Sequence, residues 1–152
     1  SKVVQIDSDL SHNPLDIPKL INNSTNYDLV IGSRYVNGIS IINWPISRLF
    51  LSYFANVYAK TITGMKIKDC TSGFKCLDID IIKNINLDTI HSQGYSFQIE
   101  LHYLSYRKKY RIIEIPIIFK DREYGNSKMS KKIILEAIFV VPLLRLKTLF
   151  SK

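Results

Sequence analysis

Two aspartates at the end of a short apolar run have the type and spacing best suited to chemistry. Asp7 and Asp9 follow residues 3–6, which read VVQI. Carboxylates two apart on a strand share a face, and where the backbone bends at a strand end both can converge on one cation. Mg²⁺ and Mn²⁺ accept one or two carboxylates and fill their remaining positions with water and phosphate oxygens. The pair therefore predicts an Mg²⁺ or Mn²⁺ site that holds a diphosphate; solvated acids or a helix cap are the alternative.

Four basic side chains stand where they could bind phosphate, three of them beside expected strand ends or turns. Arg34 follows an expected buried strand, Arg48 lies on the polar side of an expected helix, and Arg122 and Lys128 flank a glycine turn. Guanidinium groups bind phosphate with paired donors. These residues predict phosphate contacts, and the alternative for each is a solvated surface charge.

A polar cluster precedes Phe74, and a glutamine follows on a later helix. Asp69, Thr71 and Ser72 form the cluster, and Gln98 lies on the expected helix. These side chains could contact a sugar or an acceptor. The alternatives are a tight turn with a side-chain cap for the cluster and a solvent-facing position for the glutamine.

The histidines and cysteines show no pattern of a catalytic or zinc site. His12, His91 and His102 lack zinc-like spacing, and we expect them to be structural. Cys70 and Cys76 also match no common zinc pattern, and they favour a reducing compartment over a disulfide framework. No Ser/His/Asp or Cys/His arrangement for nucleophilic catalysis can be argued.

Composition indicates one globular domain with an anionic partner. The chain has 152 residues, of which 46% are hydrophobic and 22% charged, enough for a real core. The net charge of +8 favours nucleic acid, phosphorylated small molecules or an acidic membrane surface. No apolar run reaches the roughly 20 residues that cross a bilayer.

Strands that alternate with helices predict an α/β layer architecture. The first strand, at residues 3–6, is expected to be parallel and buried on both faces, with a neighbour on each side. In the first half we expect a helix at 15–21, a strand at 28–33, an exposed loop at 36–43 and a helix at 46–62, which begins at Pro45 after a cap at Asn43 and ends at Gly64. A polar loop from 67 then leads into a strand that ends at 77, followed by helices at 78–85 and 95–109. The last elements are a strand at 111–119 with an edge or bulge at Pro116, a polar loop at 121–130, and a helix at 131–150 that is kinked or interrupted at Pro142.

The expected helix at residues 46–62 has a strong amphipathic pattern. We expect its apolar stripe, and the helix at 131–150, to face the core. Lys and Arg residues flank both helices, so a position in a membrane interface stays open. The apolar stripe comprises Ile46, Leu49, Phe50, Tyr53, Phe54, Val57, Tyr58 and Ile62, and the polar side Arg48, Ser52, Asn56 and Lys60.

Six segments in series resemble the dolichyl-phosphate mannosyltransferase family, within the inverting glycosyltransferases of the GT-A fold. Their order and spacing run through almost the whole chain, and six in series are far more specific than one. The segments are IDSDLSHNP (6–14), VIGSRY (30–35), SRLFLSYFAN (47–56), DCTSGFKCL (69–77), GYSFQIEL (94–101) and EIPIIFKDREYGNSKM (114–129).

The resemblance implies the later portion of a GT-A fold, with a mixed sheet flanked by helices. Family members have a nucleotide-binding half before the acid-pair strand, and this chain lacks it. We therefore expect residues 1–152 to be a single partial catalytic domain, with metal and acceptor sites in 1–130 and an amphipathic helix in 131–152. Such a chain resembles soluble subunits that dock, with or without small membrane-anchoring partners, to the cytoplasmic face of a membrane, the endoplasmic reticulum in a eukaryote.

The resemblance also implies a metal-dependent reaction. A sugar would pass from a nucleotide-sugar, GDP-mannose in the namesake family, to the phosphate of a polyprenol such as dolichol. Asp7 and Asp9 would hold the metal against the donor diphosphate, and Arg122 and Lys128 would offset charge on the leaving diphosphate. Asp9 and Arg122 would be the catalytic residues.

On the acceptor side, the resemblance places Arg34, Arg48 and Ser52 at the lipid phosphate. A phosphate acceptor is already ionised, so no strong general base is required, which agrees with the lack of a candidate base. The residues expected near the sugar or the acceptor are Asp69, Thr71, Ser72 and Gln98.

Two other functions stay open. One is a related transferase that uses another nucleotide-sugar, such as UDP-glucose, or a non-lipid acceptor. The other is a non-catalytic basic module for nucleic acid or acidic membranes. Against nucleic acid, the Tyr and Phe residues follow helical core spacing rather than forming a stacking platform, so we expect no such partner.

Overall fold

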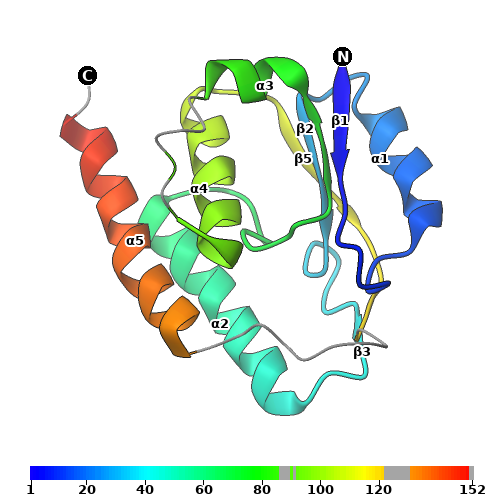
Figure 1. The fold of residues 1–152 in the computed structure, drawn as a ribbon, viewed down its shortest axis with the longest axis horizontal. Coiled ribbons are helices and arrows are strands. Elements are labelled where there is room, and N and C mark those ends of the chain that lie inside the picture. The colour runs from blue at the N-terminus through cyan, green and yellow to red at the C-terminus, as the bar shows by residue number, and fades with distance from the viewer. Residues whose placement is uncertain (86–89, 91, 122–130, 151–152) are drawn as a thin grey trace.

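The computed structural model describes residues 1–85, 90, 92–121 and 131–150 as a sheet with helices on both faces (Figure 1). The α/β class expected from the alternating pattern is confirmed. In chain order the elements are β1 (Lys2–Gln5), the short 3₁₀ helix η1 (Pro14–Asp16), α1 (Ile17–Asn23), β2 (Leu29–Ser33), β3 (Ile41–Ile42), α2 (Ile46–Thr63), β4 (Lys75–Asp78), α3 (Ile79–Asn84), α4 (Gly94–Arg107), β5 (Ile112–Pro116), β6 (Phe119–Lys120) and α5 (Lys131–Phe150).

The main sheet is mixed and has the strand order β1-β4-β2-β5. β4 runs antiparallel to both of its neighbours, whereas β2 and β5 are parallel. One row of the register, Val4, Cys76, Val30 and Ile113, crosses all four strands on one face. A second, two-stranded sheet pairs β3 with β6 in parallel beyond the ends of the main strands.

The sheet separates two apolar clusters, as period-2 alternation requires. Val30 packs with Leu20 of α1 on one face. Leu29 and Ile31 face the other way and belong to a larger cluster that includes Val141 of α5 and residues of α2 and α4. Helices α4 and α5 lie on this second side, with α2 along its lower edge (Figure 1).

β1 differs from the strand that we expected. Within the described residues it is an edge strand with one antiparallel partner, and its side chains are partly rather than fully buried. The expectation of a parallel strand buried on both faces was therefore wrong here. An apolar run shows that a strand packs against something, but it does not show the number or direction of its neighbours.

Helix α2 forms where expected, but most of its apolar stripe does not face the core. Its buried side chains are small or polar, while much of the apolar stripe that we placed in the core is exposed. The inner face packs against a polar loop whose groups need hydrogen-bond partners, and small polar residues supply them. The buried residues are Ser52, Asn56, Ala59 and Thr63, and the exposed ones include Ile46, Phe50, Tyr53, Phe54 and Val57.

Other expected boundaries shift slightly. Pro45, not Asn43, is the N-cap of α2, and α5 continues through Pro142 without interruption. The expected loop at 36–43 contains β3, and Pro116 ends β5 at the edge of the described sheet. None of the helices in the described ranges is both long and apolar enough to span a bilayer.

Candidate functional site

The acid pair lies in the loop after β1, and its two carboxylates have different surroundings. The Asp7 side chain is 54% exposed, whereas Asp9 is half-buried. Asp9 Oδ1 accepts hydrogen bonds from the backbone N–H of Ser11 at 3.2 Å and from its hydroxyl at 2.5 Å. The Ser11 carbonyl accepts from the backbone N–H of Lys120 at 3.2 Å. The turn that orients Asp9 is therefore tied to β6.

Because Gly73 has no side chain, the Asp7 carboxylate can lie against it. A Cβ atom at position 73 would lie 3.3 Å from Asp7 Oδ1 and 3.5 Å from Oδ2, so a side chain there would crowd the acid. His12 borders the same carboxylate, with Nε2 3.5 Å from Oδ2. Asp7 is thus confined by backbone on one side and by an imidazole on another.

The donor set at this loop fits a hard cation better than zinc. Within the described ranges, no group of three or more His, Cys, Asp and Glu residues could hold a metal ion. Structural zinc normally takes four such protein ligands, whereas Mg²⁺ and Mn²⁺ take one or two carboxylates and keep positions for water and phosphate. Asp7 and Asp9 match that second pattern and are the residues that could hold such a cation.

Arg34 forms a buried, two-point ion pair with Asp69. Nε donates to Asp69 Oδ2 at 2.8 Å, and Nη2 donates to Oδ1 at 2.7 Å and to the Thr71 hydroxyl at 2.7 Å. Burial alone would lower the pKa of Arg34, but the adjacent carboxylate outweighs this effect, so the pKa is raised and the charge is kept. In the described part of the chain no hydrogen bond uses Nη1, which leaves its donors for a ligand.

The loop at residues 69–73 packs against the inner face of α2 through matched polar groups. The Thr71 N–H donates to Asn56 Oδ1 at 3.2 Å, and Asn56 Nδ2 donates to the Thr71 hydroxyl at 3.3 Å. The Ser72 hydroxyl donates to the Gly32 carbonyl at 2.6 Å. Asp69, the first residue of this loop, pairs with the buried Arg34, and Gly73, its last residue, lies against Asp7. The loop therefore joins the two parts of the site.

Trp44 lies beside both arginines of the site. The guanidinium carbon of Arg48 is 4.0 Å from the centre of the Trp44 ring, and that of Arg34 is 5.7 Å away. Arg48 Nη1 also donates to Asp121 Oδ1 at 2.7 Å. A cation over an indole face is attracted by the ring, so Trp44 helps to hold both charges in place.

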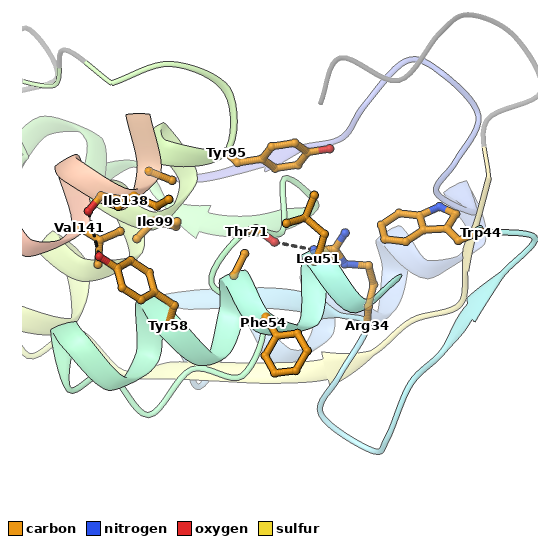
Figure 2. A pocket seen from close by; sticks show the side chains of 13 residues that line it. Arg34, Trp44, Leu51, Phe54, Tyr58, Thr71, Tyr95, Ile99, Ile138 and Val141 are labelled. Carbon is orange, nitrogen blue, oxygen red and sulfur yellow. Dashed lines mark hydrogen bonds between the residues drawn. The ribbon is translucent and has the colours of Figure 1, made fainter. Parts of the chain in front are cut away.

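A cavity of about 390 Å³ opens between α2, α4 and α5 (Figure 2). Its walls are mostly apolar, with Arg34 and Thr71 near the end that Trp44 borders. Ser52, whose hydroxyl accepts from Tyr35 at 2.8 Å, also lines it. A cation at one end of an apolar cavity suits a ligand that joins an anionic group to an apolar chain. The other lining residues are Leu51, Phe54, Ala55, Tyr58, Tyr95, Ile99, Ala137, Ile138 and Val141.

A buried lysine, Lys75, hydrogen-bonds Gln98. Lys75 Nζ donates to Gln98 Oε1 at 2.5 Å and contacts His102 Nε2 at 2.7 Å. His102 Nδ1 lies 2.9 Å from the Cys70 carbonyl, which can only accept, so Nδ1 carries the proton and Nε2 accepts from the lysine. Burial lowers the pKa of Lys75 to about 7. Burial, with the nearby lysine, also lowers the pKa of His102 well below its ordinary value.

Among the known proteins that are similar to this chain, two match nearly all of it. No protein-family model matches. The chain is 40% identical over 136 residues to an undecaprenyl-phosphate mannosyltransferase of Micrococcus luteus, which covers 90% of it. It is also 40% identical over 142 residues to a polyprenol monophosphomannose synthase of Mycolicibacterium smegmatis, which covers 93%. Over nearly all of its length the chain is similar to polyprenyl-phosphate mannosyltransferases. It spans 56% and 54% of these relatives, about half of their length.

The structure gathers part of the residue set expected for a polyprenyl-phosphate mannosyltransferase. Arg34, Ser52 and Thr71 line one cavity, and Arg48 joins them through Trp44. Of the other expected residues, Asp69 and Ser72 are buried, and Asp69 pairs with Arg34. Gln98 accepts a hydrogen bond from Lys75, Asp7 borders Gly73, and Asp9 follows Asp7 in the same loop. Arg122 and Lys128 fall outside the described residues.

Sequence reasoning missed Trp44, Tyr35 and Lys75. Trp44 is the sole tryptophan of the chain and directly precedes a proline that begins a helix, which is a detectable signal. Lys75 stands between Phe74 and Cys76 in an expected strand, and a lysine among apolar neighbours indicates a buried charge. Tyr35 carried no such signal, because only the fold brings its hydroxyl to α2.

Proposed function

We propose that the full-length protein transfers mannose from GDP-mannose to the phosphate of a polyprenyl lipid. In this proposal the chain is the later portion of a GT-A catalytic domain, preceded by a nucleotide-binding half. The names of the two relatives, the mixed α/β architecture and the chain's share of their length support it. The observation that carries it is the loop at 69–73, which holds a buried arginine at an apolar cavity and also borders the acid pair.

On the donor side, Asp7 and Asp9 would hold Mg²⁺ or Mn²⁺. The bound cation would supply positive charge against the donor diphosphate. Arg122 and Lys128, which lie outside the described residues, would complete the neutralisation of the leaving group. Gln98 would face the sugar: its carbonyl accepts from Lys75, so its amide N–H groups stay available as donors.

On the acceptor side, the lipid phosphate would lie between Arg34 Nη1, Arg48 and Ser52. An ionised phosphate oxygen would attack the anomeric carbon of the sugar, and the bond to the nucleoside diphosphate would break as the new C–O bond forms. The diphosphate would leave with the bonding electrons. Because the nucleophile is already charged, the protein contributes charge placement rather than a general base.

The exposed apolar faces of α2 and α5 support a peripheral position on a membrane. Phe50 and Phe54 on α2 and Phe139 and Leu143 on α5 are all more than half exposed. Such faces with basic neighbours are typical of helices that lie in a lipid interface. We place this membrane contact on the cytoplasmic side, where a small anchoring subunit could also dock.

The test uses full-length protein with Mn²⁺, a polyprenyl phosphate and either GDP-mannose or UDP-glucose. We expect mannosyl-phospholipid product, and we expect Asp9→Ala to reduce the rate by about 100-fold or more, as loss of a key electrostatic group does. The matched control is Asp28→Ala, because Asp28 pairs with the exposed Arg111 at the far end of β2.

Three outcomes would contradict this proposal in different ways. An active Asp9→Ala variant would remove the donor-side assignment. Transfer of glucose from UDP-glucose, with no transfer of mannose, would show that the donor is not GDP-mannose. Binding to generic DNA with a steep salt dependence, together with no sugar transfer, would replace the enzyme with a nucleic-acid-binding module.

A further inference from the structure

His12 is a buried imidazole at the edge of the acid pair with no role in the mechanism above. Its side chain is 3% exposed and is enclosed by two aromatic rings. The Phe74 ring lies 4.9 Å from it and tilted by 34°, and the Phe119 ring lies 5.0 Å from it and edge-on at 84°. Packing therefore fixes where this ring sits.

The polar atoms of His12 are not satisfied by that packing. Within the described ranges neither ring nitrogen has a hydrogen-bond partner, although both are buried. Leaving a buried N–H without an acceptor is unfavourable, and most buried polar groups in proteins have a partner. Nε2 lies 3.5 Å from Asp7 Oδ2, only a few tenths of an ångström beyond a normal hydrogen bond.

The contacts around His12 and Asp7 indicate which of these two side chains can move. The backbone before His12 is held, because the Ser11 carbonyl accepts from β6 and the Ser11 hydroxyl donates to Asp9. Asp7, by contrast, is about half exposed. A small shift of the carboxylate toward the ring would complete the hydrogen bond, and Gly73 limits how far the carboxylate can turn the other way.

We propose that His12 is a positioning residue that donates Nε2–H to Asp7 and so orients this carboxylate toward the cation. The inference rests on the proposed role of Asp7 as a cation ligand. Groups that hydrogen-bond a metal ligand fix its direction, and their loss typically weakens metal binding by 10- to 100-fold. The apolar enclosure by Phe74 and Phe119 strengthens the effect, since it keeps water from competing for Nε2.

The test separates hydrogen bonding from packing with two substitutions in the full-length protein. His12→Phe keeps an aromatic ring between Phe74 and Phe119 but removes the N–H, whereas His12→Gln keeps a donor near the position of Nε2. We expect Mn²⁺ affinity, measured by calorimetric titration without substrates, to fall about 10-fold or more in His12→Phe and to recover in large part in His12→Gln. The thermal unfolding midpoint of metal-free His12→Phe should stay equal to that of the wild type or rise, because a buried unsatisfied group is removed.

Asp7→Ala distinguishes failure of this inference from failure of the proposed cation site. Loss of Mn²⁺ binding in Asp7→Ala with unchanged affinity in His12→Phe would overturn the positioning role alone. Unchanged affinity in Asp7→Ala would overturn both. A weakened His12→Phe that His12→Gln does not restore, with a lowered metal-free unfolding midpoint, would assign His12 to packing instead.

Discussion

The two ends of the loop at residues 69–73 border regions built in opposite ways. At one end Arg34 and Asp69 are both buried and share two hydrogen bonds between their side chains. At the other end Asp7 is about half exposed, and beside it lies a histidine just beyond hydrogen-bond distance. The arginine side is assembled from groups within the chain, whereas the acid side is left open toward solvent.

This difference follows from the charges that each region has to carry. A buried guanidinium needs a counter-charge in the folded protein, because an unpaired buried charge is very unfavourable. Exposed carboxylates are stabilised by water and can exchange that water for a cation. The protein therefore supplies its own anion to the buried arginine, whereas in the proposed function the aspartates would take a cation from solution.

The largest expected effect comes from breaking the buried ion pair. Asp69→Ala leaves Arg34 charged and buried, and we expect the free energy of unfolding to fall by about 3–5 kcal/mol. Urea unfolding followed by circular dichroism measures this change. The control is Asp28→Ala, which breaks the exposed Asp28–Arg111 pair and should change stability far less. Equal losses in the two variants would contradict the contrast between buried and exposed charge.

The buried lysine, Lys75, gives the next largest effect, which is a dependence of stability on pH. Burial lowers the pKa of Lys75 from 10.5 to about 7, so between these values the unfolded chain binds a proton that the folded chain has lost. The free energy of unfolding should therefore rise with pH from about pH 7, by at most about 1.4 kcal/mol per unit. Above about pH 9 the rise should flatten, because burial raises the pKa of Cys70 from 9.0 and the unfolded thiol ionises first.

Unfolding at several pH values between about 7 and 9 checks this expectation. Lys75→Met should abolish the rise, whatever it does to stability at one pH. Lys60→Met, which replaces an exposed lysine of α2, should leave the rise in place. A wild-type protein whose stability is flat across this range would show that Lys75 stays charged in the fold.

The smallest effect is expected at Trp44, on the acceptor side alone. Trp44→Leu removes the ring that contacts Arg48, a contact of about 1 kcal/mol, so KM for polyprenyl phosphate should rise about fivefold. KM for the nucleotide-sugar should stay the same. Trp44→Phe keeps an aromatic face and should lose less. An equal rise in both KM values would mean that Trp44 does not act on the acceptor alone.

Helix α2 shows what the sequence could and could not predict. Its position was evident from periodicity and its end from Gly64, but the expectation that its whole apolar stripe faces the core was wrong. Periodicity identifies the apolar face of a helix and says nothing of whether protein or lipid covers it. The sequence did not indicate that Asn56, on the polar side of the helix, is buried, because its partner, Thr71, belongs to a loop distant in sequence.

The candidate site divides in the same way. The acid pair and Arg34 could be found because each follows an apolar run that forms a strand, β1 and β2. The pairing of Arg34 with Asp69 could not, since these residues are 35 positions apart and only the fold joins them. Nor did composition or spacing indicate that His12 borders Asp7 inside an aromatic enclosure.

The central inference is that the loop at 69–73 places the lipid phosphate and the cation at one reaction centre. Mn²⁺ is paramagnetic and broadens the ³¹P resonance of a phosphate held nearby, so the measurement is ³¹P NMR of polyprenyl phosphate bound to full-length protein with GDP and Mn²⁺. We expect strong broadening of the acceptor phosphate in the wild type, and its loss with Mg²⁺ or in Asp9→Ala. A bound acceptor phosphate whose resonance stays sharp in the presence of bound Mn²⁺ would contradict the shared centre.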